Sequence, residues 1–188
     1  MDHYIDLHLL PDPEFPTHQL LSALCAKLHR ALVQTGRDNI GISFPGHDEA
    51  VPSLGTHLRL HGSEAALSTL IAIPWLGGLT GLLRQSAIQA VPQQAQHRQV
   101  KRVQAKSSPE RLRRRAMRRH GIDAATARAR IPDTAAESLN LPFVQLASRS
   151  TGQPCFHLYI RHGPVRATPT SGTFSAYGLS KDATIPWF

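Results

Sequence analysis

The spacing of the hydrophobic residues changes repeatedly over the first 91 positions, and this order restricts the fold more than any other feature of the chain. Residues 4–10 alternate apolar and polar side chains, which predicts a strand. Leucines at helical spacing follow, between Thr17 as a predicted N-cap and Gly36 as the residue that ends the helix. The chain therefore begins with a strand and an amphipathic helix.

The same reading continues to residue 91. Two strands are predicted at 40–44 and 56–61, then a helix that Ser63 caps and Pro74 ends, then a strand at 82–91. The order strand, helix, strand, strand, helix, strand is that of ferredoxin-like domains. We therefore predict an α+β protein whose residues 1–94 form a ferredoxin-like, RRM-like domain.

Residues 95–188 are predicted to form a second, α/β domain that carries an arginine-rich helix. Residues 92–107 contain many Gln, Lys and Arg, which predicts a linker that touches a ligand. Ser108-Pro109-Glu110 is typical of a helix start, and Gly121 of a helix end. Beyond it we predict short helices at 123–130 and 133–139 and strands at 143–148, 156–161, 165–168 and 173–178.

Positive charge is concentrated in one segment. Ten of the 21 Lys and Arg residues lie between Arg98 and His120, with Glu110 as the single acid among them. This segment has a net charge of +9, and the whole chain has +8, so the remainder is close to neutral. Such a local excess is typical of a surface that binds a polyanion.

The helix predicted at 109–120 presents its arginines on one face. At about 100° per residue, five of them fall together: Arg111, Arg114, Arg115, Arg118 and Arg119. These like charges repel one another, and the arginine fork matches phosphate oxygens, so a nucleic acid is the expected partner. The alternatives are a merely solvated face, binding to DNA and binding to a membrane surface. The helix lacks a Leu-rich opposite face, which argues against the membrane.

Composition excludes other classes of protein. No apolar run reaches about 18 residues, and the opening Met-Asp-His-Tyr lacks the basic and apolar stretches of a signal peptide. Cys25 and Cys155 fit neither a disulfide framework nor a zinc spacing. We expect a cytoplasmic protein with no cofactor. We also expect no metal site, because His57 and His61 lie in a strand-like segment and their side chains would not converge on one ion.

His29 is the candidate base, at the edge of the leucine stripe of the first helix. A histidine exchanges protons near neutral pH, yet an edge histidine is often structural, so both roles stay open. Ser148, Ser150 and Thr151 enter a turn after a strand and could bind phosphate or ribose, or form an ordinary polar turn. Tyr177 and Phe156 could each be a packing residue or part of a functional site.

Many ordered blocks together resemble the type I-F CRISPR-associated endoribonucleases that mature CRISPR RNA. The blocks cover nearly the whole chain: MDHY, PDPEFP, KLH, RQV, RVQAKS, PERLRRR, MRRH, RIPDT, LPFV, STGQ, YIRHGP, YGLSK and PWF. The resemblance implies a repeat RNA hairpin cut without metal at the 3′ base of its stem, and membership of a surveillance complex.

The resemblance also implies roles for individual residues. His29 would take the proton of the 2′-hydroxyl, Ser148 would hold the ribose, and Tyr177 would line the site. Arg102 and Gln104 would read base edges low in the stem, and Phe156 would stack beneath it. Further RNA contacts are implied for Arg114, Arg115, Arg118, Arg119, His120, Ser150 and Thr151. Arg111 is added to the predicted RNA-binding residues because it shares the charged face of the helix.

Two other functions remain compatible with the residues. A hairpin-binding protein that does not cut would need the basic helix but not His29. A DNA-binding protein would bind an all-deoxy hairpin as well as RNA.

Overall fold

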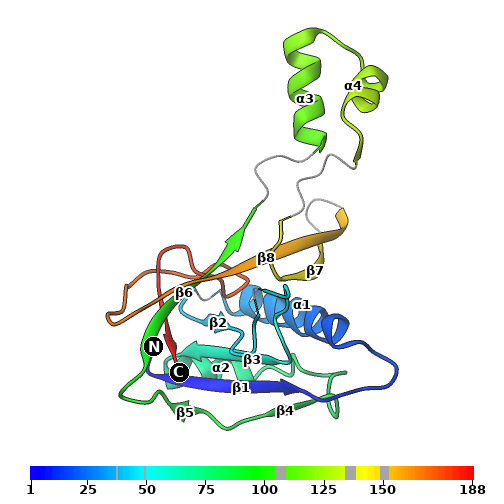
Figure 1. Cartoon of the computed structure of the whole chain (residues 1–188). Helices are drawn as coiled ribbons and strands as arrows, with labels where there is room; N and C mark the ends of the chain where they lie inside the picture. Colours follow the sequence, from blue (N-terminus) through cyan, green and yellow to red (C-terminus); the bar gives the residue numbers. More distant parts are fainter. Residues whose placement is uncertain (37, 49, 105–108, 134–138, 149–152) are drawn as a thin grey trace. The chain divides into compact units, whose positions relative to one another are not determined.

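The computed structural model describes residues 1–36, 38–48, 50–104, 109–133, 139–148 and 153–188 (Figure 1). It is a mixed α and β structure with two antiparallel sheets, which confirms the α+β class. The chain divides into two compact units, residues 1–103 with 141–188 and residues 104–140. We call them the body and the helical unit. The predicted boundary between residues 94 and 95 falls inside the body, where the chain passes from one sheet to the other, and stays a prediction.

The first sheet has the strand order β2-β3-β1-β4, with β5 also paired to β1. Its described elements are β1 (His3–Leu9), α1 (Thr17–Thr35), β2 (Gly41–Ser43), β3 (His57–Gly62), α2 (Glu64–Ile71), β4 (Leu83–Gln85) and β5 (Gln89–Ala90). Every pairing in this sheet is antiparallel. The single strand predicted at 82–91 is thus two short strands.

The helix ends of the first sheet agree in part with those predicted from the sequence. Ser63 caps α2 as predicted, because its side chain accepts a hydrogen bond from the backbone N–H of Ala66. Thr17 is the first residue of α1 rather than its cap; Pro16 holds the cap position. Gly36 ends α1 in the left-handed conformation, at φ 62°.

The second sheet has the order β7-β8-β6-β9. Its strands are β6 (Gln96–Val103), β7 (Phe143–Ser148), β8 (Gln153–Arg166) and β9 (Ile185–Trp187). The prediction of a linker at 92–107 is wrong for residues 96–103, because β6 pairs with both β8 and β9 and buries Val100. The predicted strands 156–161 and 165–168 are one long strand.

The helical unit contains α3 (Pro109–His120) and α4 (Ala124–Arg130). Gly121, at φ 62°, ends α3, and its N–H donates to the carbonyl of Met117. Asp123 caps α4 by accepting from the N–H of Thr126 at 2.7 Å. The predicted cap Ser108, and most of the helix predicted at 133–139, lie outside the described residues.

One hydrophobic core joins the two sheets of the body. Helix α1 contacts β1 on one side and β7 on the other, and it lies between the sheets in Figure 1. Its buried side is the predicted leucine stripe with Cys25 and Ala31, and burial raises the pKa of the Cys25 thiol to about 12. No helix in the described part of the chain is long and apolar enough to cross a membrane.

Two buried histidines make stability depend on pH. Burial lowers the pKa of His61 to about 3, and burial with the charges of His47 and Arg98 lowers the pKa of His162 to about 2. The backbone N–H of Phe44 donates to Nε2 of His162, as suits a neutral ring. Unfolding restores ordinary pKa values near about 6.5. The unfolded chain therefore binds more protons below that pH, and acid destabilises the fold.

We expect the free energy of unfolding to fall between pH 6.5 and pH 4 by about 1.4 kcal/mol per pH unit for each of these histidines. Urea unfolding at pH 6, 5.5 and 5 measures this slope. The variant His162→Gln should reduce the slope. Equal slopes in wild type and His162→Gln would contradict this assignment.

Candidate active site and RNA-binding surface

His29 lies near the end of α1 and is half-buried. Its Nδ1 is 2.8 Å from the carbonyl oxygen of Ala176. A carbonyl can only accept, so Nδ1 carries the proton and Nε2 is left with a free lone pair. The backbone thus selects the tautomer in which Nε2 can take a proton from a substrate.

The ring of Tyr177 fixes the plane of this imidazole. The two rings stack with centroids 4.1 Å apart and planes 12° apart. A stacked ring restricts rotation of the histidine about its side-chain bonds, while the hydrogen bond to Ala176 sets which edge points outward. The fold therefore brings together His29 and Tyr177, two candidates that lie far apart in the sequence.

The loop that carries Ala176 and Tyr177 is held by a tight turn. The N–H of Gly178 donates to the carbonyl of Ser175, and the N–H of Ile42 in β2 donates to the carbonyl of Gly178. Gly178 has φ 70°, and a Cβ there would lie 2.6 Å from Cγ2 of Ile42. Only glycine fits this position. The strand predicted at 173–178 is wrong: these residues form a turn closed by an isolated bridge between Phe174 and Ser180.

The remaining candidates in the body lie on the second sheet. Ser148 ends β7, opposite Gln153 of β8. Phe156 on β8 is half-buried against the core, and the guanidinium carbon of Arg102, an exposed residue of β6, lies 5.8 Å from its ring centroid. Ser150 and Thr151 lie outside the described residues. The structure thus places a cationic side chain near this aromatic ring.

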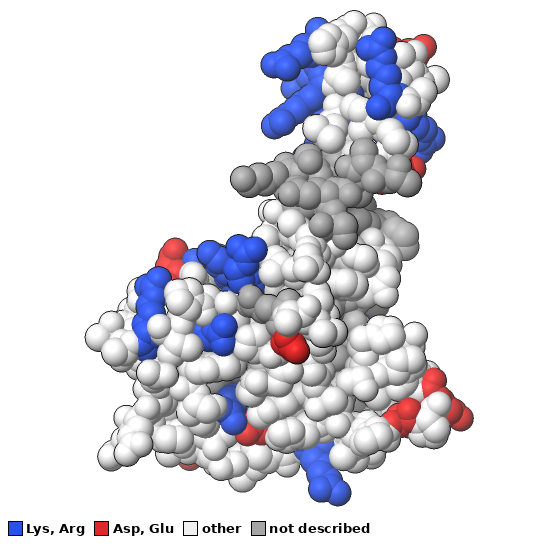
Figure 2. Space-filling model, viewed as in Figure 1, with Lys and Arg blue, Asp and Glu red and all other residues white. Residues whose placement is uncertain are grey.

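The other predicted RNA-binding residues belong to the helical unit. Gln104, Arg111, Arg114, Arg115, Arg118, Arg119 and His120 are all exposed. Figure 2 shows Lys and Arg side chains crowded over this unit. In the part of the chain that the structure describes, no ion pair involves Arg114, Arg115, Arg118 or Arg119. Their charge is therefore available to an external anion.

Arg113 has a different role, which sequence reasoning did not assign. Its Nε donates to the carbonyl of Ile131 at 2.7 Å, and its Nη2 pairs with Asp133 at 2.7 Å. These bonds fasten α3 to the segment after α4. The sequence signal was available, since Arg113 falls off the face shared by the other arginines. Arg113 thus supports the helical unit.

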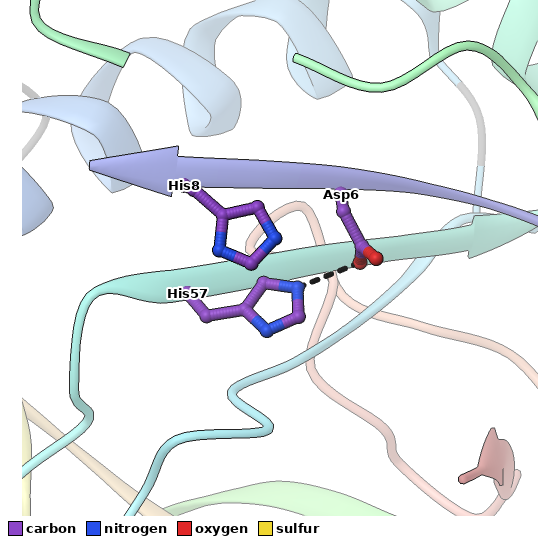
Figure 3. A group of neighbouring side chains, drawn as sticks. All are labelled: Asp6, His8 and His57. Carbon is purple, nitrogen blue, oxygen red and sulfur yellow. Dashed lines mark hydrogen bonds and ion pairs between the residues drawn. The ribbon is translucent and has the colours of Figure 1, made fainter. Parts of the chain in front are cut away.

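One group of side chains in the first sheet could be taken for a metal site. Asp6 and His8 on β1 and His57 on β3 hold potential ligand atoms within 4.8 Å of one another (Figure 3). Asp6 already accepts from His57 at 2.7 Å and from Arg59 at 2.7 and 3.0 Å. Burial raises the pKa of Asp6, but these hydrogen bonds outweigh it and hold the pKa far below its usual range.

The two imidazoles of this group are not arranged for a shared ion. Their rings stack, with centroids 4.0 Å apart and planes 26° apart. A histidine binds metal through a lone pair in the plane of its ring, and nearly parallel planes do not meet beside the rings. The positively charged guanidinium of Arg59 also lies against the carboxylate of Asp6, where it would repel a metal cation. The arrangement fits packing and charge pairing of the sheet.

Comparison with known proteins gives a consistent result. A family profile described as "CRISPR-associated protein (Cas_Csy4)" matches residues 4–188. The chain is 56% identical over 188 residues to the CRISPR-associated endonuclease Cas6/Csy4 of Pseudomonas aeruginosa (strain UCBPP-PA14), with both chains covered completely. It is 45% identical over 188 residues to the protein of the same name from Escherichia coli (strain UTI89 / UPEC), again over the whole of both.

Proposed function

The chain belongs to the Cas_Csy4 family of CRISPR-associated proteins, and on this premise we propose that it is an endoribonuclease that processes pre-crRNA. It binds the stem-loop formed by the CRISPR repeat and cuts at the 3′ base of the stem, which yields mature crRNA. The names of the two relatives support nuclease activity and a CRISPR substrate.

The cut uses the RNA's own 2′-hydroxyl and needs no metal. The 2′-oxygen attacks the adjacent phosphorus as its proton passes to Nε2 of His29, and the bond from phosphorus to the 5′-oxygen breaks. The 5′-oxygen then gains a proton, so the products are a 2′,3′-cyclic phosphate and a 5′-hydroxyl. The observation that carries this mechanism is the hydrogen bond from Nδ1 of His29 to Ala176, which leaves Nε2 as a base.

The other site residues position the RNA. Ser148 holds the ribose at the scissile phosphate, together with Ser150 and Thr151, and Tyr177 lines the site while fixing the plane of His29. Phe156 stacks beneath the last base pair of the stem. Arg102 and Gln104 pair with base edges low in the stem, because such side chains can form two hydrogen bonds with one base.

The arginine-rich helix α3 lies along the groove of the stem. Arg111, Arg114, Arg115, Arg118, Arg119 and His120 contact phosphates and base edges there. An A-form major groove is narrow, so the helix needs the open end of a short hairpin to enter it. The enzyme keeps hold of its product and becomes a subunit of a type I-F CRISPR surveillance complex.

The body supplies the scaffold. Its first sheet has the order β2-β3-β1-β4 with antiparallel pairs, and α1 and α2 follow β1 and β3. This order supports a ferredoxin-like N-terminal half, an arrangement that many RNA-binding modules use.

A single 2′-deoxy substitution in the substrate tests the reaction. We expect the wild-type enzyme to cut a labelled all-ribose repeat hairpin in the presence of EDTA. A hairpin with one deoxyribose on the 5′ side of the scissile phosphate should bind with similar affinity and stay intact, because the attacking oxygen is missing. Cleavage of the deoxy hairpin, or cleavage only after Mg²⁺ is added, would contradict the mechanism. If neither RNA is cut under any condition, the protein is a hairpin-binding protein.

A further inference from the structure

The outer face of the second sheet carries a cluster of aromatic rings. Phe143 on β7 stacks on His157 of β8, with centroids 4.1 Å apart, and meets the edge of Tyr159 at 5.5 Å. Phe143 is 43% exposed. We call Phe143, His157 and Tyr159 the aromatic platform. His157 is also exposed and Tyr159 is half-buried, whereas the buried side chains of β8 are Leu158 and Ile160 on its opposite face.

Two positive side chains continue the aromatic platform along the same face. Arg161 follows Tyr159 by two residues on β8, and Lys101 on β6 lies directly opposite Arg161 in the register of the two strands. Like charges opposite each other destabilise a sheet. No ion pair among the described residues compensates either of them. An external anion would compensate the charges of Lys101 and Arg161.

The sheet as a whole is free of acidic residues. None of the residues of β6, β7, β8 or β9 is Asp or Glu, whereas five are Lys or Arg: Arg98, Lys101, Arg102, Arg161 and Arg166. A surface meant for a protein partner usually mixes both signs or is mainly apolar at its centre. Rings beside Lys101 and Arg161 instead match single-stranded nucleic acid, whose bases stack on the rings while its phosphates meet these two cations.

A hollow of about 560 Å³ adjoins the aromatic platform. Its lining includes Phe143 and Gln145 of β7, Ser22 of α1 and the loop from Pro52 to Thr56. The lining contains no acidic group, and it combines apolar side chains with an imidazole, hydroxyl groups and one amide. Such groups can accept and donate hydrogen bonds to a base or a ribose. The hollow offers a nucleotide a place next to the exposed ring of Phe143.

We propose that the aromatic platform, with Lys101 and Arg161, binds the single-stranded RNA on the 5′ side of the repeat stem-loop. The inference rests on the proposed function. The cut lies on the 3′ strand of the stem, which must reach His29. If Phe156 stacks beneath the last base pair of the stem, the two RNA strands leave that base pair on opposite sides of the Phe156 ring. Alternation along β8 places Phe156 on one face of the sheet and the aromatic platform on the other. The 5′ strand is therefore the one that meets the aromatic platform.

Equilibrium binding with uncleavable RNA tests this assignment. Three hairpins carry the single deoxyribose at the cut site and have no flank, an eight-nucleotide 5′ flank or the same flank on the 3′ side. We expect the 5′ flank to raise the affinity of the wild-type chain at least about fivefold, the size of one stacked base. The double variant Phe143→Ala/Arg161→Gln should lose this gain and bind the unflanked hairpin as wild type does.

Control variants separate stacking from general charge and from misfolding. Val165→Ala removes an apolar side chain that is 42% exposed on β8 but outside the aromatic platform, and Arg84→Gln removes an exposed charge from the first sheet. Both should keep the gain from the 5′ flank, and Phe143→Trp should keep it too because its ring can stack.

Three outcomes would overturn the proposal: no gain from the 5′ flank in wild type, an equal gain from the 3′ flank, or a loss of the gain in Arg84→Gln. The first would leave the aromatic platform as a surface for a protein subunit. Failure of the proposed function is a separate result, because it is measured as cleavage of the all-ribose hairpin without a flank. That cleavage should be the same in wild type and in Phe143→Ala/Arg161→Gln.

Discussion

Replacement of His29 by alanine is expected to lower the rate of hairpin cleavage by about 10²–10⁴-fold, the usual contribution of a general base. The affinity for the hairpin should change little, because one half-buried imidazole contributes little to binding compared with the arginines of α3. Alanine favours helix, so α1 should persist. Single-turnover cleavage with enzyme in excess measures the chemical step, and binding to the deoxy hairpin measures affinity.

Three further variants locate the effect at the His29 imidazole. His8→Ala removes an exposed histidine on the face of β1 opposite Leu7, away from α1, and should leave the cleavage rate unchanged. Tyr177→Phe keeps the ring that stacks on His29 and should retain most of the rate, whereas Tyr177→Ala frees the imidazole and should lower it. A His29→Ala enzyme that cuts within about tenfold of wild type would mean that another group takes the proton.

Parts of the fold with a regular hydrophobic period could be predicted from sequence. The alternation before Leu10 predicts β1, and the leucine stripe predicts α1 with its end at Gly36. The segment 96–103 could not be predicted as a strand, because only Val100 among its residues is buried and a bulge between Arg98 and Val100 breaks its alternation. Its pairing is decided by β8 and β9, which are far away in sequence.

The candidate site, like the fold, could be predicted from the sequence only in part. His29 and Tyr177 could be selected by residue type and by resemblance, but the contact between them depends on a turn more than 140 residues from α1. The atom that orients His29 is a backbone carbonyl, which has no sequence signature. Likewise Phe143, His157 and Tyr159 look like ordinary strand residues until the register of β7 and β8 places them on one exposed face.

Removing the charge of α3 is expected to have the largest effect on binding. In the variant with Arg114, Arg115, Arg118 and Arg119 all replaced by glutamine, the affinity for the hairpin should fall on the order of 10³-fold at moderate salt. Glutamine is a good helix former, and the four like charges repel one another, so α3 itself should be no less stable. Arg130→Gln, an exposed charge on α4, serves as the single-site control.

The dependence of affinity on salt distinguishes phosphate contacts from a structural effect. Each arginine that neutralises a phosphate contributes about one unit or less to the slope of log affinity against log salt, so the glutamine variant should lose up to about four units. A large loss of affinity with an unchanged slope would mean instead that the helical unit is misfolded. Replacing the same four residues by lysine keeps the charge and should keep the slope. Lysine lacks the two-pronged donor, however, so this variant should discriminate less between the correct hairpin and one with altered stem pairs.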